Sequence, residues 1–209
     1  MHTFPLTYLL QGLALGFTAA ASPGAFQAFL VGSTLNRGWR GGVPVALAPL
    51  LSDPPVVLLI LLLLDQLPPA FLRVVSVSGG AFALYLAWGL WRGWRKGENP
   101  GSSAGFPIQA GSLLWRAALM NLLSPGVYTF WTLVNGPLLL GALRQSGWHG
   151  LSFVLGFYST FVGGMLLLVF AFHQARRLGP PLIRTLTLLS LLILLGFALY
   201  LLWRGLLGF

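Results

Sequence analysis

The sequence lacks cysteine and is poor in charged residues, and both shortages limit what the protein can be. Without cysteine, disulfide bonds, thiol redox chemistry and thiolate metal sites are excluded. Only 7% of the residues are charged, far below the roughly 25% of a typical soluble domain. The histidines and carboxylates show no metal-ligand spacing, and no nucleophile lies in a catalytic setting. The sequence therefore predicts no metal site, no cofactor and no enzymatic activity.

Long apolar runs fill most of the chain, and hydrophobic residues make up 56% of it. Six apolar segments come close to the roughly 20 residues that a membrane-spanning helix needs. This pattern predicts an all-α integral membrane protein with six transmembrane helices. The segments cover residues 6–35, 43–64, 70–92, 112–140, 149–172 and 182–207.

Basic residues outnumber acidic ones, and the formal net charge is +9. They lie at the ends of the apolar segments rather than in one patch, which favours lipid headgroups over nucleic acid as their partners. With the N-terminus outside, nine fall on the inner side (Arg37, Arg40, Arg92, Arg95, Lys96, Arg116, Arg176, Arg177 and Arg184) and three on the outer side (Arg73, Arg144 and Arg204). We therefore expect a multi-pass protein of the plasma (inner) membrane with both termini outside. A cleaved signal peptide ending near Ala21 is the alternative, although the start of the chain has no basic region.

Two of the apolar segments are interrupted by the same tripeptide, Ser22-Pro23-Gly24 and Ser124-Pro125-Gly126. Proline removes a backbone donor and glycine loosens the chain, so we expect the first and fourth helices to break there. Backbone groups freed at membrane depth must find partners in protein, water or ligand. Matching breaks in two halves of a membrane protein are the best sequence indication of a transporter's binding site.

The two halves of the chain resemble each other. Residues 81–88 match residues 196–203, and each half begins with a broken segment. A polar, glycine-rich stretch, 97–111, predicts a flexible linker between a first unit, 1–96, and a second, 112–209. Because each unit has an odd number of spans, the second must insert upside down relative to the first. We therefore expect two inverted three-helix repeats, a common plan among secondary transporters.

Asp53 is the one acidic residue expected inside the membrane, because Asp65 and Glu98 fall at the end of a span and in the linker. It could be a helix N-cap with Pro54 at the first helical position. Even then, residues 54–64 would extend only about 16 Å at about 1.5 Å each, roughly half the hydrocarbon thickness. A lone carboxylate at that depth is a functional-site hypothesis by default. It suits a group that binds a coupling proton or ion, or a substrate ammonium.

The breaks also create half-helix N-termini, whose free amides and dipole favour a substrate carboxylate. We expect the substrate to contact a set of residues around both breaks: Ser22, Pro23, Gly24, Gln27, Asn121, Ser124, Pro125 and Gly126. Gln27 and Asn121 could instead satisfy freed backbone carbonyls. Residues 158–160 are expected to make helix–helix contacts, and the small-residue pattern of Gly12 and Gly16 fits either internal packing or a homodimer.

Several motifs, taken in order, carry a family resemblance. They are Gly16–Gly24 in the first span, residues 37–42 in the turn after it, Asp53, residues 79–88, and Asn121–Pro125 in the fourth span. Together they resemble the lysine exporter (LysE/RhtB) family of small amino-acid exporters, over nearly the whole chain. The chain departs from the family pattern at Ala25, where a proline is usual, and at Gly126, where a lysine is usual. Both positions flank the expected site, so the departures bear on the substrate more than on the fold.

We therefore predict a secondary transporter that exports a small zwitterionic substrate, an amino acid or a relative, by alternating access. Asp53 is expected to couple transport to protons or Na⁺. The alternative is a channel-like or lipid-interacting membrane protein without amino-acid transport. A cation channel usually has rings of acids or polar filter residues, whereas this chain offers one buried acid.

Overall fold

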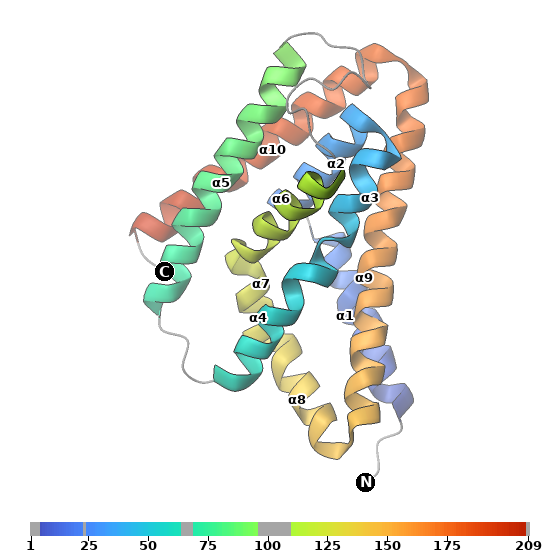
Figure 1. Cartoon of the computed structure of the whole chain (residues 1–209), viewed down its shortest axis with the longest axis vertical. Coiled ribbons are helices and arrows are strands. Elements are labelled where there is room, and N and C mark those ends of the chain that lie inside the picture. Colours follow the sequence, from blue (N-terminus) through green and yellow to red (C-terminus); the bar gives the residue numbers. More distant parts are fainter. Residues whose placement is uncertain (1–4, 23, 64–68, 96–109, 208–209) are drawn as a thin grey trace.

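The computed structural model describes residues 5–22, 24–63, 69–95 and 110–207, and every element in them is a helix. Figure 1 shows an elongated bundle whose helices run between its two ends. In chain order the helices are α1 (Pro5–Ala21), α2 (Ala25–Arg37), α3 (Trp39–Leu47), α4 (Pro49–Leu63), α5 (Pro69–Arg95), α6 (Ala110–Leu122), α7 (Pro125–Phe130), the π-helix η1 (Trp131–Asn135), α8 (Gly136–Gln145), α9 (Gly147–Ala175), the 3₁₀-helix η2 (Arg176–Leu178) and α10 (Pro180–Leu207).

Four helical stretches among the described residues are long and apolar enough to cross a membrane. They are Trp39–Leu62, Pro125–Gln145, Gly147–Ala175 and Arg184–Leu207, and the bent pair α1–α2 adds a fifth. The predicted segment 70–92 coincides with α5, which does not meet the same test. The part of the chain that the structure describes is therefore all-helical, and its four to five candidate spans are consistent with a membrane protein. The end of the predicted linker is helical, because α6 already begins at Ala110.

The first span breaks where the first Ser-Pro-Gly predicts, and its two halves meet at an angle of 67°. Local side chains take up carbonyls at the end of α1: Ser22 donates to Thr18 O at 2.7 Å, and Gln27 donates to Ala19 O at 3.3 Å. Gly24 is the extended N-cap of α2. The break therefore leaves α1 with partly satisfied carbonyls and α2 with a free N-terminus.

The second Ser-Pro-Gly breaks the fourth segment, because α6 ends at Leu122 and α7 starts at Pro125 after an extended Ser124. Beyond it the chain widens into η1, in which Gly136 N–H bonds to Trp131 O. Pro137 follows at the start of α8 and has no N–H to offer the carbonyl four residues back. Such π-turns are rare and occur frequently at functional sites.

The second span contains Pro44, Pro54 and Pro55 within helices, and only Pro49 stands at a helix start. Helix α4 begins at Pro49, so Asp53 lies inside it, and the N-cap alternative for Asp53 is wrong. Pro54 and Pro55 cannot donate to the carbonyls four residues before them, which are those of Leu50 and Leu51. The break in this span instead falls at Ala48, between α3 and α4.

Helices α1 and α9 pack closely against each other, and glycines allow this approach. A Cβ on Gly12 or Gly16 would overlap backbone carbonyls of Phe153 or Phe157, and one on Gly156 would meet Leu13 N at 3.0 Å. Thr160 Oγ1 also donates across this contact to Leu13 O at 2.9 Å. The small-residue pattern of α1 therefore serves packing within the chain, and Thr160 makes the helix–helix contact predicted for it.

Arginines gather at one end of the bundle, the upper end in Figure 1. The turn between α2 and α3, the end of α5 and η2 all lie there, and they contribute Arg37, Arg40, Arg92, Arg95, Arg176 and Arg177. The end of α5 contacts the start of α10, where Trp94 Nε1 donates to Arg184 O at 3.1 Å and faces the Arg184 guanidinium. Arg144, in the last turn of α8, lies at the opposite end.

Candidate functional site

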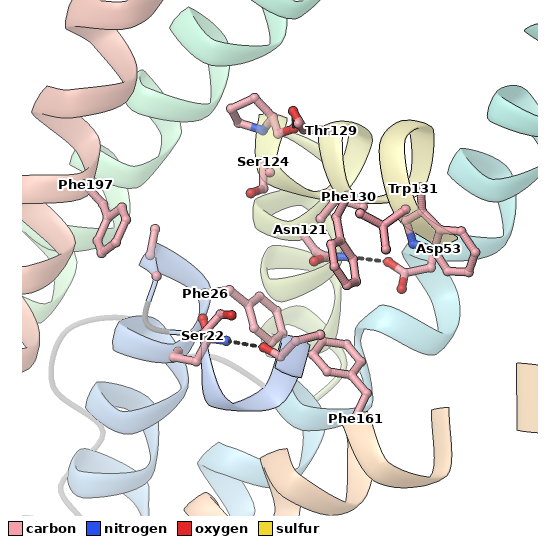
Figure 2. A pocket seen from close by; sticks show the side chains of 18 of the residues that line it. Ser22, Phe26, Asp53, Asn121, Ser124, Thr129, Phe130, Trp131, Phe161 and Phe197 are labelled. Carbon is pink, nitrogen blue, oxygen red and sulfur yellow. Dashed lines mark hydrogen bonds between the residues drawn. The ribbon is translucent and has the colours of Figure 1, made fainter. Parts of the chain in front are cut away.

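Both helix breaks open onto one cavity of about 540 Å³. Its wall includes every described residue that the sequence assigns to the site: Ser22, Gly24, Gln27, Asp53, Asn121, Ser124, Pro125 and Gly126. Pro23 lies outside the described residues. Residues about 100 positions apart in the chain thus meet around one space, and Figure 2 shows Ser22, Asn121 and Ser124 around it.

Asp53 reaches the cavity wall with only 3% of its surface exposed, and two side chains donate to its carboxylate. Asn121 Nδ2 donates to Oδ1 at 2.5 Å (Figure 2) and also to Ser52 Oγ at 2.8 Å. Tyr158 Oη donates to Oδ2 at 3.1 Å. The carboxylate therefore joins three helices, α4, α6 and α9, through hydrogen bonds with neutral side chains.

Tyr158 is the site residue that the sequence reasoning missed. The helix–helix contact expected of it is present, since its hydroxyl joins α9 to α4, but its partner there, Asp53, was not predicted. The available signal was its place in the fifth span, which corresponds to the Asp53 span in the other half of the chain. Its neighbours differ from it, since Ser159 bonds within its own helix and Thr160 bonds to α1.

The alternatives left open for Gln27 and Asn121 resolve differently. Gln27 satisfies a carbonyl at the first break, that of Ala19, while also lining the cavity. Asn121 binds Asp53 and Ser52 instead of a freed carbonyl. Asn121 thus connects the second break to the acid, and Gln27 stabilises the first break.

Two helix N-termini, those of α2 and α7, contribute residues to the cavity wall. Neither the Gly24 N-cap of α2 nor the Ser124 N-cap of α7 has a side-chain cap bond within the described residues. Ala28 N–H is the amide that bonds to Gly24 O, so the amides before it in the first turn of α2 have no helical carbonyl. At the second break, Gly126 is exposed and lines the cavity. These groups suit an anionic part of a ligand.

Aromatic rings form much of the remaining wall, and Asp53 is the only charged residue among the described residues that line it. The rings are Phe26, Phe130, Trp131, Phe157, Phe161, Phe197 and Tyr200. The part of the chain that the structure describes contains no group of histidines and acids that could hold a metal ion. The arrangement can therefore bind a small molecule with an amine, a carboxylate and an apolar part.

Comparison with known proteins agrees with this geometry. Residues 17–205 match the family model described as LysE type translocator, which is well over half of the 209-residue chain. Searches of curated proteins and of solved structures gave no match. The matched region includes both helix breaks, Asp53 and Tyr158, and the family consists of translocators rather than enzymes. The chain belongs to the LysE type translocator family.

Proposed function

We propose that the protein is a secondary transporter that exports a small zwitterion, an amino acid or a close relative, in exchange for protons. The observation that carries the proposal is the position of Asp53. This buried carboxylate lines a cavity between two half-helix N-termini and is held by Asn121 and Tyr158. A carboxylate in the membrane can bind a proton or an ammonium, and the half-helix amides can bind a carboxylate.

The inverted repeat is part of this proposal, and the helix packing supports it. If a two-fold axis relates the halves, each contact must recur with the corresponding helices exchanged. The contact of α1 with α9 has its counterpart in that of α4 with α6, and the contact of α2 with α10 has its counterpart in that of α5 with α7. The packed pair α5–α10 is its own counterpart. We therefore propose six spans in two units, 1–96 and 112–209, joined by residues 97–111.

In the proposed cycle the substrate carboxylate binds at the amides of α2 and α7, and the ammonium or the coupling proton binds at Asp53. Asp53 and Tyr158 belong to different halves, so rocking of the halves changes the partners of the acid as well as its access to water. A proton can replace the substrate ammonium at Asp53, which makes the two compete and so couples their movements. Na⁺ in place of the proton is the competing form of this mechanism.

The arginine-rich end of the bundle supports an orientation in the plasma (inner) membrane with both termini outside. The turn between α2 and α3, the end of α5 and η2 would face the cytoplasm, where basic loops are favoured. An accessibility test of single cysteines at the exposed positions Trp39 and Gly147 would check this, because the chain has no cysteine of its own. A cysteine at position 39 should react only from the cytoplasm and one at position 147 only from outside.

A channel-like or lipid-interacting protein is the rival interpretation. The described residues that line the cavity include one acid, Asp53. A cation pathway usually needs rings of acids or polar filter groups. Counterflow in proteoliposomes separates the two interpretations. Saturable exchange of an internal for an external amino acid supports a transporter, and flux that does not saturate supports a channel.

Replacing Tyr158 with Phe is expected to lower coupled exchange about tenfold without unfolding the protein, because a hydrogen bond to a charged group is lost. The ring, which packs against Phe157 at 5.1 Å between centroids, is kept. Exchange rate and thermal stability should be measured together. Tyr8→Phe is the matched control, since Tyr8 accepts from Gln145 away from the cavity. Equal exchange rates in Tyr158→Phe and Tyr8→Phe would show that the Tyr158 hydroxyl has no role in transport.

A further inference from the structure

We infer that the cavity selects an amino acid with a bulky apolar side chain, of the phenylalanine type, and rejects amino acids whose side chains are charged. The inference rests on the proposed function, because it names the substrate class of the same site. Three independent features of the wall carry it: the shortage of charge, the aromatic rings, and their position relative to Asp53.

The cavity wall is poor in charged residues. Among the described residues of the wall, Asp53 is the only acid, and there is no lysine, arginine or histidine. The half-helix amides and Asp53 can together hold one carboxylate and one ammonium. A lysine substrate would bring a second cation and a glutamate substrate a second anion, and neither would find a partner there. An unpaired charge in a low-dielectric site costs several kcal/mol, so such substrates bind poorly.

The aromatic rings supply a surface for an apolar side chain. Phe157 is the centre of a packed group, with its ring centroid 5.4 Å from that of Trp131 and 5.6 Å from that of Phe161. Trp131 and Phe157 are each 2% exposed, so they fix the wall from behind, while the half-buried Phe130 and Phe197 offer their rings to a ligand. A fixed aromatic wall favours a ligand ring or a branched aliphatic group.

The rings also lie on both sides of the acid. Figure 2 shows Phe130 and Trp131 near Asp53, and Phe197 of α10 on the opposite side of the cavity. A substrate ammonium at Asp53 would therefore lie near aromatic rings, which attract cations through their faces. Its side chain would extend past the helix breaks toward Phe197 and Leu201, where the described wall residues carry no charge. The cavity of about 540 Å³ is in the range of sites that hold ligands well beyond the size of glycine.

The first test is a counterflow panel in proteoliposomes with phenylalanine, alanine, lysine and glutamate. Phenylalanine should exchange at least tenfold faster than lysine and glutamate at equal concentration. The same four compounds should be tested in detergent for their effect on thermal stability, and phenylalanine should stabilise the protein most. Equal exchange or equal stabilisation by lysine or glutamate would overturn the inference and leave the exporter proposal standing.

The second test uses Phe197. In Phe197→Ala the ratio of phenylalanine to alanine exchange should fall about tenfold, because an aromatic contact is lost. Phe197→Glu should allow lysine to exchange, since it places a carboxylate where the side chain of the bound lysine would end. Leu199→Ala, two residues away and 61% exposed on the outside of α10, is the matched control and should keep the wild-type ratio. An unchanged ratio in both Phe197 variants would contradict the inference.

The two proposals fail in different ways. If no amino acid exchanges, the exporter proposal is contradicted, and the thermal-stability panel then decides the ligand class alone. Stabilisation by phenylalanine but not by lysine would still support the selective cavity. Stabilisation by none of the four, or by all of them equally, would overturn it.

Discussion

Asp53→Asn is expected to lose pH-driven amino-acid transport completely while remaining folded. Among the described residues of the cavity wall, Asp53 is the only carboxylic acid and there is no histidine, so we expect it to carry the coupling proton, which an amide cannot do. In proteoliposomes with an imposed pH gradient, net transport by the variant should fall to the level of empty vesicles. Exchange of one substrate molecule for another, which needs no proton, should survive at a reduced rate.

The fold should tolerate this change because the introduced amide can replace both hydrogen bonds of the acid. The amide oxygen would still accept from Asn121, and the amide nitrogen could donate to the Tyr158 hydroxyl, which can reverse its role. The melting temperature should therefore stay within about 4 °C of the wild type, which corresponds to roughly 1 kcal/mol.

Ser52→Ala is the matched control for this experiment. It removes one of the two acceptors of Asn121 from the same helix but leaves the carboxylate in place. Coupled transport in Ser52→Ala should stay close to that of the wild type. Full pH-driven transport in Asp53→Asn would show that Asp53 does not couple transport to protons, whatever the control shows.

Gly156→Ala is expected to have the largest effect on stability. Its added methyl group would overlap Leu9 O and lie 3.0 Å from Leu13 N, and both are backbone atoms that cannot rotate away. The helices α1 and α9 would have to separate. Overpacking of this kind costs about 1–3 kcal/mol, which exceeds the gain of up to about 1 kcal/mol from replacing a helical glycine with alanine. We expect the melting temperature in detergent to drop by about 5 °C or more.

Gly163→Ala, in the same helix, is the control that separates packing from helix propensity. No atom of the described residues that could clash lies within 4 Å of a Cβ at Gly163. Because only the propensity term remains, this variant should be as stable as the wild type or slightly more stable. If both Gly156→Ala and Gly163→Ala raise the melting temperature, α1 and α9 do not pack as closely as described.

The sequence predicted much of the site because its signals were local. Each Ser-Pro-Gly breaks its helix at the expected residue, and the cavity wall contains every described member of the predicted site. A proline inside an apolar run changes the backbone whatever surrounds it, so its effect can be predicted without knowing the tertiary structure.

Features that depend on tertiary contacts were not predictable in this way. The helix-cap alternative for Asp53 arose because Pro54 follows it, yet α4 starts four residues earlier at Pro49. The bond from Tyr158 to Asp53 joins residues 105 positions apart, and no local pattern marks it. The aromatic wall also arises only when distant helices pack together.

Direct measurement of proton movement tests the central claim, the exchange of a substrate for protons at Asp53. Wild-type and Asp53→Asn proteoliposomes would carry a pH-sensitive dye in the lumen and start without a gradient. Adding external phenylalanine should change the luminal pH in wild-type vesicles only, with an initial rate that saturates with substrate. Substrate-dependent proton movement of equal size in both proteins would contradict the account. So would net uptake of the amino acid into wild-type vesicles without proton movement.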